Sequence, residues 1–105
     1  MVLMVADEIS LCDALEKFKP DVVVADLSLP ISTEANISWL LKKNFPSIKV
    51  IILSVHDEKS VVDDVMAAGI EGFVLKRRAV IDLVPAIREV LQGHKYISPD
   101  LNVAP

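Results

Sequence analysis

Four short apolar runs without polar alternation are the feature that most constrains this chain. They lie at Val2–Ala6, Val22–Ala25, Val50–Leu53 and Phe73–Leu75, and most of them are rich in β-branched residues. A strand of this kind is buried on both of its faces, which is typical of a parallel sheet with helices on each side. The runs therefore predict a parallel sheet of about four strands.

Amphipathic segments between and after these runs predict four helices. The first helix stops at Pro20, the second ends before Pro46, and the third has Gly69 as its C-terminal cap. Apolar residues from Leu83 to Leu91 mark the fourth helix, and we expect Pro85 to fall near its first turn, where a missing amide is tolerated. This alternation of strand and helix predicts an α/β fold with a doubly wound parallel sheet.

Composition limits the classes of function. The 105 residues suit one domain, and a hydrophobic fraction of 52% excludes intrinsic disorder. A net charge of −4 disfavours direct binding of nucleic acid. The single cysteine, Cys12, excludes an internal disulfide and a zinc site, so a reducing cytoplasm is the expected location. No apolar run reaches the length of about 18 residues that a membrane span needs.

We expect a domain at residues 1–93 and a linker or tail at residues 94–105, which contains two prolines and no periodicity.

Three different polar groups follow consecutive predicted strands. Asp26 ends the second strand, Ser54 the third and Lys76 the fourth. Ligands of open parallel sheets bind beyond the carboxyl ends of the strands, so these groups should converge at one edge. A carboxylate there can attack a phosphoryl donor and become an acyl phosphate, while the ammonium and the hydroxyl hold the phosphoryl oxygens. Phosphoryl transfer also needs charge neutralisation, so Mg²⁺ is the expected cofactor.

Four segments resemble, in their order and spacing, the receiver domain of bacterial response regulators of the NarL/FixJ (LuxR) type. The segments are KPDVVVADLSLP at 19–30, VIILSVHDE at 50–58, AAGIEGFVLK at 67–76, and AIREV followed by GHKYISP within 86–99. They resemble the phosphoacceptor strand, the strand of the switch hydroxyl, the final strand, and the last helix with its linker. The resemblance implies a flavodoxin-like fold, here shortened by one strand and one helix.

The resemblance also implies a role for each residue of the pocket. Asp26 would be the phosphoacceptor, Ser54 the switch hydroxyl and Lys76 the ammonium that pairs with the phosphate. Phe73 would be the aromatic side chain whose rotamer follows the state of Ser54. His56 lies two residues beyond Ser54, where its side chain would tune the lifetime of the phosphate.

The expected Mg²⁺ ligands are Asp26 and the backbone carbonyl of Ser28, whose side chain would also tune the lifetime of the phosphate. In the family, a strand that ends in two acidic residues supplies the other ligands, and here only Asp7 and Glu8 could replace them. Asp7 could equally be the N-cap of the first helix. We therefore expect Mg²⁺ binding to be weakened.

The stretch before Asp26 is too short for the family pattern, and two alignments compete. In the first, Val2–Ala6 corresponds to the second strand of the family, and the first strand with its acidic pair is absent, as an internal or misassigned start would produce. In the second, the run is the first strand and a later helix and strand were lost. The positions of Ala14, Leu15 and Pro20 favour the first alignment. Under either alignment, a strand–helix–strand unit could put Val2–Ala6 beside the strand of Asp26. The loop at 31–34 also lacks the glycine that relatives often carry.

Three functions remain as hypotheses. The leading one is a module of a two-component system that accepts phosphate from a histidine kinase on Asp26 and regulates an attached or partner DNA-binding domain. It is not an enzyme, beyond self-phosphorylation and self-dephosphorylation. The alternative is a pseudo-receiver, an interaction domain without phosphotransfer, and an unrelated flavodoxin-like binding protein ranks last. A second copy of the chain is a further candidate partner, whereas we expect no membrane partner and no nucleic acid bound by this chain itself.

Overall fold

Strands and helices alternate along the chain as predicted. The computed structural model describes residues 1–6, 8–26 and 30–99, apart from the side chains of residues 8, 9, 31 and 32. The elements are β1 (Val2–Val5), α1 (Glu8–Phe18), β2 (Val22–Ala25), α2 (Ile31–Asn44), β3 (Lys49–Ser54), α3 (Lys59–Ala67), β4 (Gly72–Leu75), a 3-10 turn η1 (Lys76–Arg78), α4 (Ala79–Leu91) and β5 (Tyr96–Ile97). None of the helices within the described ranges is long and apolar enough to cross a membrane.

All strands of the described residues belong to one parallel sheet in the order β1-β2-β3-β4-β5. The second apolar run is buried along its whole length, as a strand covered on both faces must be. The predicted doubly wound α/β fold is confirmed, and the predicted four strands gain a fifth, β5. As either alignment allowed, β1 lies next to β2, the strand that leads to Asp26.

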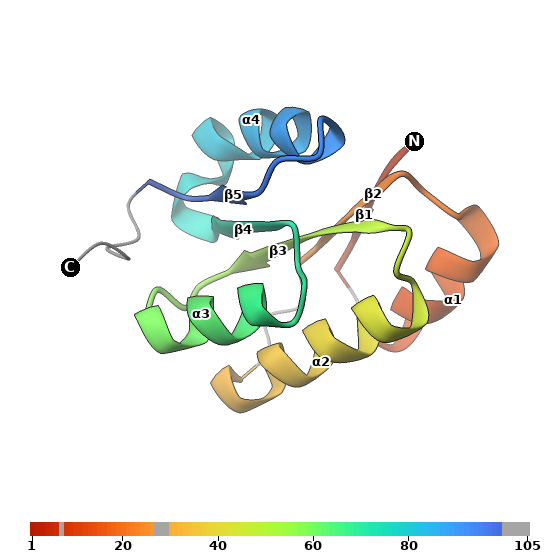
Figure 1. Cartoon of the computed structure of the whole chain (residues 1–105), viewed down its shortest axis with the longest axis horizontal. Helices are drawn as coiled ribbons and strands as arrows, with labels where there is room; N and C mark the ends of the chain where they lie inside the picture. The colour runs from red at the N-terminus through yellow and green to blue at the C-terminus, as the bar shows by residue number, and fades with distance from the viewer. Residues whose placement is uncertain (7, 27–29, 100–105) are drawn as a thin grey trace.

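Two unequal helical layers cover the sheet. Helices α1, α2 and α3 lie on one face, where Leu11, Leu15, Leu41 and Val65 join the inward side chains of the strands. Helix α4 alone lies on the opposite face (Figure 1) and buries Val90 and other side chains against β2, β3 and β4. The strands step across the sheet in a constant direction, but the connecting helix changes face after β4. The β4–α4–β5 connection therefore has the opposite hand to the three before it, which is rare among parallel crossovers.

Helix α4 begins one turn earlier than predicted, at Ala79, so Pro85 lies inside the helix and not near its first turn. A proline here removes the hydrogen bond to the carbonyl of Ile81. Ile81 is exposed, so water can satisfy that carbonyl. Arg78, just before the helix, forms an ion pair with Asp82 four residues later, which supports the extra turn.

The segment after α4 is tied to the sheet by a buried carboxylate. Asp82 is only 2% exposed and accepts hydrogen bonds from Arg78 Nε at 2.8 Å and Nη2 at 3.2 Å. The Arg78 hydrogen bond is the main cause that lowers the pKa of Asp82, and the hydroxyl groups of Ser98 and Tyr96 add to it. Ser98 in turn accepts a hydrogen bond from the amide of Leu75 at 3.0 Å. The first part of the predicted tail therefore extends the sheet, because these polar groups fix it beside β4.

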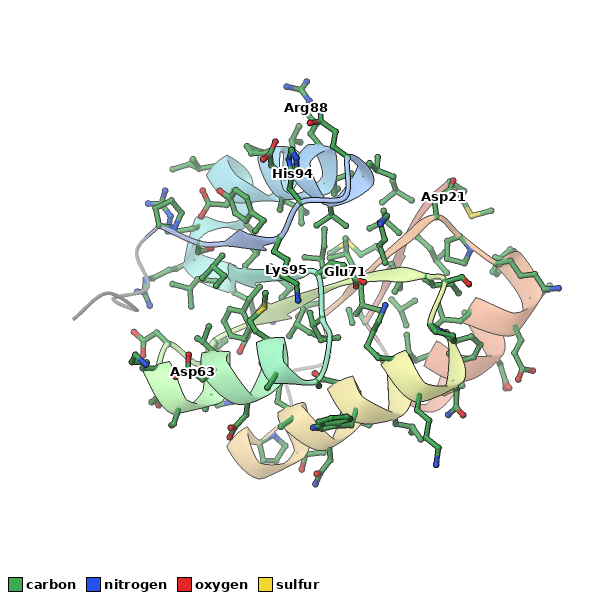
Figure 2. The ribbon with its side chains drawn as sticks, viewed as in Figure 1. Asp21, Asp63, Glu71, Arg88, His94 and Lys95 are labelled. Carbon is green, nitrogen blue, oxygen red and sulfur yellow. The ribbon has the colours of Figure 1, made fainter. Side chains whose placement is uncertain are left out.

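Asp82→Ala should destabilise the fold by about 2–3 kcal/mol at pH 7, because it leaves Arg78 and the two hydroxyl groups without their acceptor. The folded-state pKa is depressed, so this contribution is present above the unfolded value of ~4 and is lost as the pH falls through the folded value. Urea denaturation should therefore show a difference between wild type and variant that shrinks in acid. Asp63→Ala is the matched control, because Asp63 (Figure 2) lies on α3 in an exposed ion pair with Lys59. An equal loss of stability in both variants would contradict the role of Asp82.

Apolar side chains stay open on the edge strand next to α4. Val2 and Met4 pair with Val22 and Val24 and so share the face of α4, yet they are 46% and 57% exposed. Leu91 of α4 is also 49% exposed. Open apolar patches of this kind favour association, so we expect the 105-residue chain to self-associate. Sedimentation at about 100 µM should show a dimer that Met4→Lys weakens, whereas a strictly monomeric wild type would refute this expectation.

Candidate functional site

The carboxyl ends of β2, β3 and β4 bring a carboxylate, a hydroxyl and an ammonium to one edge of the sheet. Asp26 directly follows β2, Ser54 is the last residue of β3, and Lys76 directly follows β4. Lys76 Nζ lies 2.8 Å from Asp26 Oδ1, although the two residues are separated by the whole of β3. The parallel register thus produces the juxtaposition that the strand ends predicted.

Asp26 is held by the backbone, and its Oδ1 contacts the Lys76 ammonium without a well-aligned hydrogen bond. Its amide donates a hydrogen bond to the carbonyl of Val5 at 2.8 Å, which continues the ladder between β1 and β2. Oδ1 is buried and accepts no well-aligned hydrogen bond from any described group. The contact with Lys76 is therefore an ion pair, and it leaves the lone pairs of Oδ1 able to bind an electrophile or a cation.

Ser54 is buried at the same edge of the sheet, and its hydroxyl oxygen accepts a hydrogen bond from the backbone. Its Oγ accepts a hydrogen bond from the amide of His56 at 3.0 Å, which folds the loop after β3 back over the strand end. Ser54 is 4% exposed. By strand alternation its side chain shares the sheet face of Ile52, the face covered by α1, α2 and α3.

Phe73 lies on that same face and points inward. Its side chain is fully buried and belongs to the larger of the two cores. Phe73 pairs with Ile52 in register, while Ser54 pairs with Leu75 two positions further along. The aromatic ring and the hydroxyl are thus close neighbours on one face of the sheet, with Ile97 of β5 packed against the same core.

The predicted metal ligands are only partly placed. Asp7 and Ser28 lie outside the described residues, and Glu8 is the first residue of α1, with its side chain also outside them. Within the described ranges, no group of three or more His, Cys, Asp or Glu side chains could hold a metal ion. Asp26 fits one position of an Mg²⁺ shell, because its buried Oδ1 is a carboxylate oxygen that accepts no hydrogen bond from any described group, and carboxylate oxygen is the donor type that this ion prefers.

Glu34 is a neighbour of the site that sequence reasoning missed. It lies in the first turn of α2, yet it is only 5% exposed, and its Oε2 is 3.8 Å from Nε2 of His56. Burial raises the pKa of Glu34, while hydrogen bonding to Ser54 and the charge of His56 oppose the rise. The sequence signal is the segment at 31–34, expected as a loop that lacks the usual glycine, whereas the structure makes these residues the first turn of α2. An acidic residue in a first helical turn is usually exposed, where its charge interacts favourably with the helix dipole. The sequence pattern therefore does not predict the burial of Glu34.

Two hollows lie at opposite ends of the sheet. One of about 180 Å³ is lined by Ser54, Val55, Leu75, Lys76 and Arg77, directly beside the converging groups. A larger one of about 880 Å³ is lined by residues 19–21 and 44–49 among others, at the amino ends of the strands. The converging groups lie at the smaller hollow, because the ammonium and the hydroxyl line it and the carboxylate pairs with that ammonium.

Proteins that resemble this chain in sequence belong to one family. A family profile for the response regulator receiver domain matches residues 1–88. The transcriptional regulatory protein DegU of Brevibacillus brevis is 34% identical over 87 residues, which is 83% of this chain and 37% of that protein. The response regulator GacA of Pseudomonas aeruginosa is 34% identical over 85 residues, or 81% of this chain and 40% of GacA.

Solved structures of the same family have a similar fold. The isolated receiver domain of RcsB from Salmonella enterica serovar Typhimurium, in the presence of the phosphomimetic BeF₃⁻, superposes with a TM-score of 0.77 at 28% identity. That match covers 90% of this chain and 71% of the RcsB domain. The chain spans less than half the length of the curated relatives that it matches. From the family profile, the relatives and the shared fold, the chain belongs to the response regulator receiver domain family.

Proposed function

We propose that this chain is a phosphorylation-switched signalling module in which Asp26 accepts a phosphoryl group from a histidine kinase. The observation that carries the proposal is the 2.8 Å contact between Lys76 Nζ and Asp26 Oδ1, with the buried Ser54 on the strand between them. One carboxylate, one fixed positive charge and one hydroxyl donor are the groups that formation of an acyl phosphate needs.

The proposed transfer is a simple displacement. A carboxylate oxygen of Asp26 attacks the phosphorus of the kinase phosphohistidine, the new O–P bond forms, and the N–P bond breaks with its electron pair returning to the imidazole. Lys76 then exchanges its contact with the carboxylate for the phosphoryl oxygens, and the hydroxyl of Ser54 donates to one of them. The phosphoryl group brings a charge of about −2, which is enough to bias a two-state element that includes Ser54 and Phe73.

Mg²⁺ would be held by Asp26 and, as the family resemblance implies, by the backbone carbonyl of Ser28, with Asp7 and Glu8 as the remaining candidates. When bound, it would neutralise charge that develops on the transferring phosphoryl group. Because the family's acidic pair has no certain equivalent in this chain, phosphorylation should require more Mg²⁺ than in receiver domains with the full set.

Incubation with acetyl phosphate and Mg²⁺, read by intact mass, tests the proposal directly. We expect one phosphoryl group per chain, and none when the metal is chelated. Absence of labelling at saturating Mg²⁺ would leave the alternative, an interaction domain that keeps the receiver fold without phosphotransfer. What favours this alternative is the sequence, which has no clear equivalent of the acidic pair that the family uses to hold Mg²⁺.

The partners of the chain follow from the same proposal. The histidine kinase would donate the phosphate, and a DNA-binding effector domain, attached or on another chain, would receive the signal. Solved structures of RcsB include a complex with DNA, which is a property of that protein.

This chain by itself should not bind DNA. Its net charge is −4, and Lys42, Arg77 and Arg78 already face carboxylates on Glu71, Asp57 and Asp82. Non-specific binding requires several phosphates to be neutralised at once. A gel-shift assay at about 100 mM salt should therefore show no complex with promoter fragments. A sequence-specific shift with sub-micromolar affinity would contradict this expectation.

A further inference from the structure

Glu34 is a buried carboxylate beside the site, and its hydrogen bonding is incomplete. Its side chain is 6% exposed, and Oε1 accepts no well-aligned hydrogen bond from any described group. Burying an ionised carboxylate without full compensation is costly. The burial of Glu34 at the edge of the candidate site therefore points to an effect on the neighbouring groups.

The groups around Glu34 link it to the candidate switch hydroxyl. His56 reaches the carboxylate through Nε2, 3.8 Å from Oε2, and donates its backbone amide to Oγ of Ser54 at 3.0 Å. Oγ of Ser54 is thus occupied as an acceptor, and a serine hydroxyl has one proton to donate. Hydrogen bonding to Ser54 lowers the pKa of Glu34, so this proton favours the ionised carboxylate.

We propose, building on the proposed function, that Glu34 is a positioning residue for Ser54. In the unphosphorylated chain, the Glu34 carboxylate attracts the Ser54 hydroxyl proton. When Asp26 carries a phosphoryl group, Ser54 exchanges this partner for a phosphoryl oxygen. Glu34 therefore competes with the phosphoryl group for one proton donor.

The exchange couples phosphorylation to protonation of Glu34. Once Ser54 has turned away, the carboxylate is buried without its donor and faces added negative charge, so it should take up a proton. Conversely, a neutral Glu34 holds Ser54 less tightly, and acid should ease the exchange. The other titratable groups acting on Glu34 are His56, whose positive charge favours the ionised form, and Glu58, whose negative charge opposes it.

A carboxyl NMR titration tests the contact between Glu34 and Ser54 without any phosphorylation. In Ser54→Ala, the pKa of Glu34 should rise further, because the hydrogen bond that lowers it is lost. Asp63→Asn removes an exposed carboxylate on α3 and should leave the Glu34 titration unchanged. An identical Glu34 pKa in wild type and Ser54→Ala would overturn the proposal.

Labelling by acetyl phosphate with Mg²⁺ tests the competition itself. The ratio of the labelling rates of Glu34→Gln and wild type cancels the pH dependence of the reagent. We expect this ratio to reach about ten at a pH above the Glu34 titration observed by NMR, and to approach one below it, as wild-type Glu34 gains its proton. A ratio that does not change across the Glu34 titration would overturn the proposal. If neither protein is labelled, the proposed function fails, and the NMR titration still decides whether Glu34 holds Ser54.

Discussion

Asp26→Asn should reduce phosphorylation by acetyl phosphate to background while the chain stays folded. The amide has the shape of the carboxylate but neither its charge nor its nucleophilic oxygen, so no acyl phosphate can form. The backbone hydrogen bond from residue 26 to Val5 is kept, and with it the pairing of β1 and β2. Intact mass after incubation with Mg²⁺ and acetyl phosphate measures the labelled fraction, and circular dichroism checks the fold.

Asp57→Asn is the matched control for this experiment. Asp57 lies in the loop after β3, close to the same end of the sheet, but its side chain is 53% exposed and pairs with Arg77 at 3.2 Å. The control should be labelled as fully as wild type. Equal labelling of Asp26→Asn and wild type would remove Asp26 from the proposed role, and loss in both variants would point to a general effect of charge at this end of the molecule.

Phe73→Ala should lower the free energy of unfolding by about 3–5 kcal/mol. The ring is fully buried between the sheet and the layer of α1, α2 and α3, so its removal leaves a cavity that the surrounding strands and helices cannot close completely. A loss of this size is a large part of the stability of a small domain. Urea denaturation with an unchanged m-value would report it as a shift of the midpoint.

Phe18→Ala provides the comparison, since it removes the same ring from the end of α1, where the side chain is 46% exposed. Its cost should stay below about 1 kcal/mol. If Phe73→Ala is too unstable to purify, Phe73→Leu fills most of the cavity and should cost only about 1–2 kcal/mol. A loss in Phe73→Ala as small as the one expected for Phe18→Ala would show that the ring of Phe73 contributes little to the core.

The sequence predicted the layered fold well because burial leaves a local signature. β2 is the clearest case, since its three valines and Ala25 are buried on both faces and have no polar alternation. The same pattern placed Asp26 and Lys76 at the carboxyl ends of their strands, and parallel pairing brought them together. The ends of the helices depend on contacts that hydrophobic periodicity does not report. Helix α4 begins at Ala79 because an ion pair between Arg78 and Asp82 supports one more turn.

Other features depended on contacts between distant residues, and no local pattern encodes them. β5 has only two residues and joins the sheet through a crossover of the rarer hand, and neither feature has a sequence signal. Its pairing is supported by hydrogen bonds of Ser98 and of the buried Asp82. Glu34 has the sequence position of an exposed acid in a first helical turn, but the tertiary fold buries it beside His56. Hydrophobic periodicity reports which face of an element is buried. Which polar groups meet there is decided by strand order and register, and only the tertiary structure contains these.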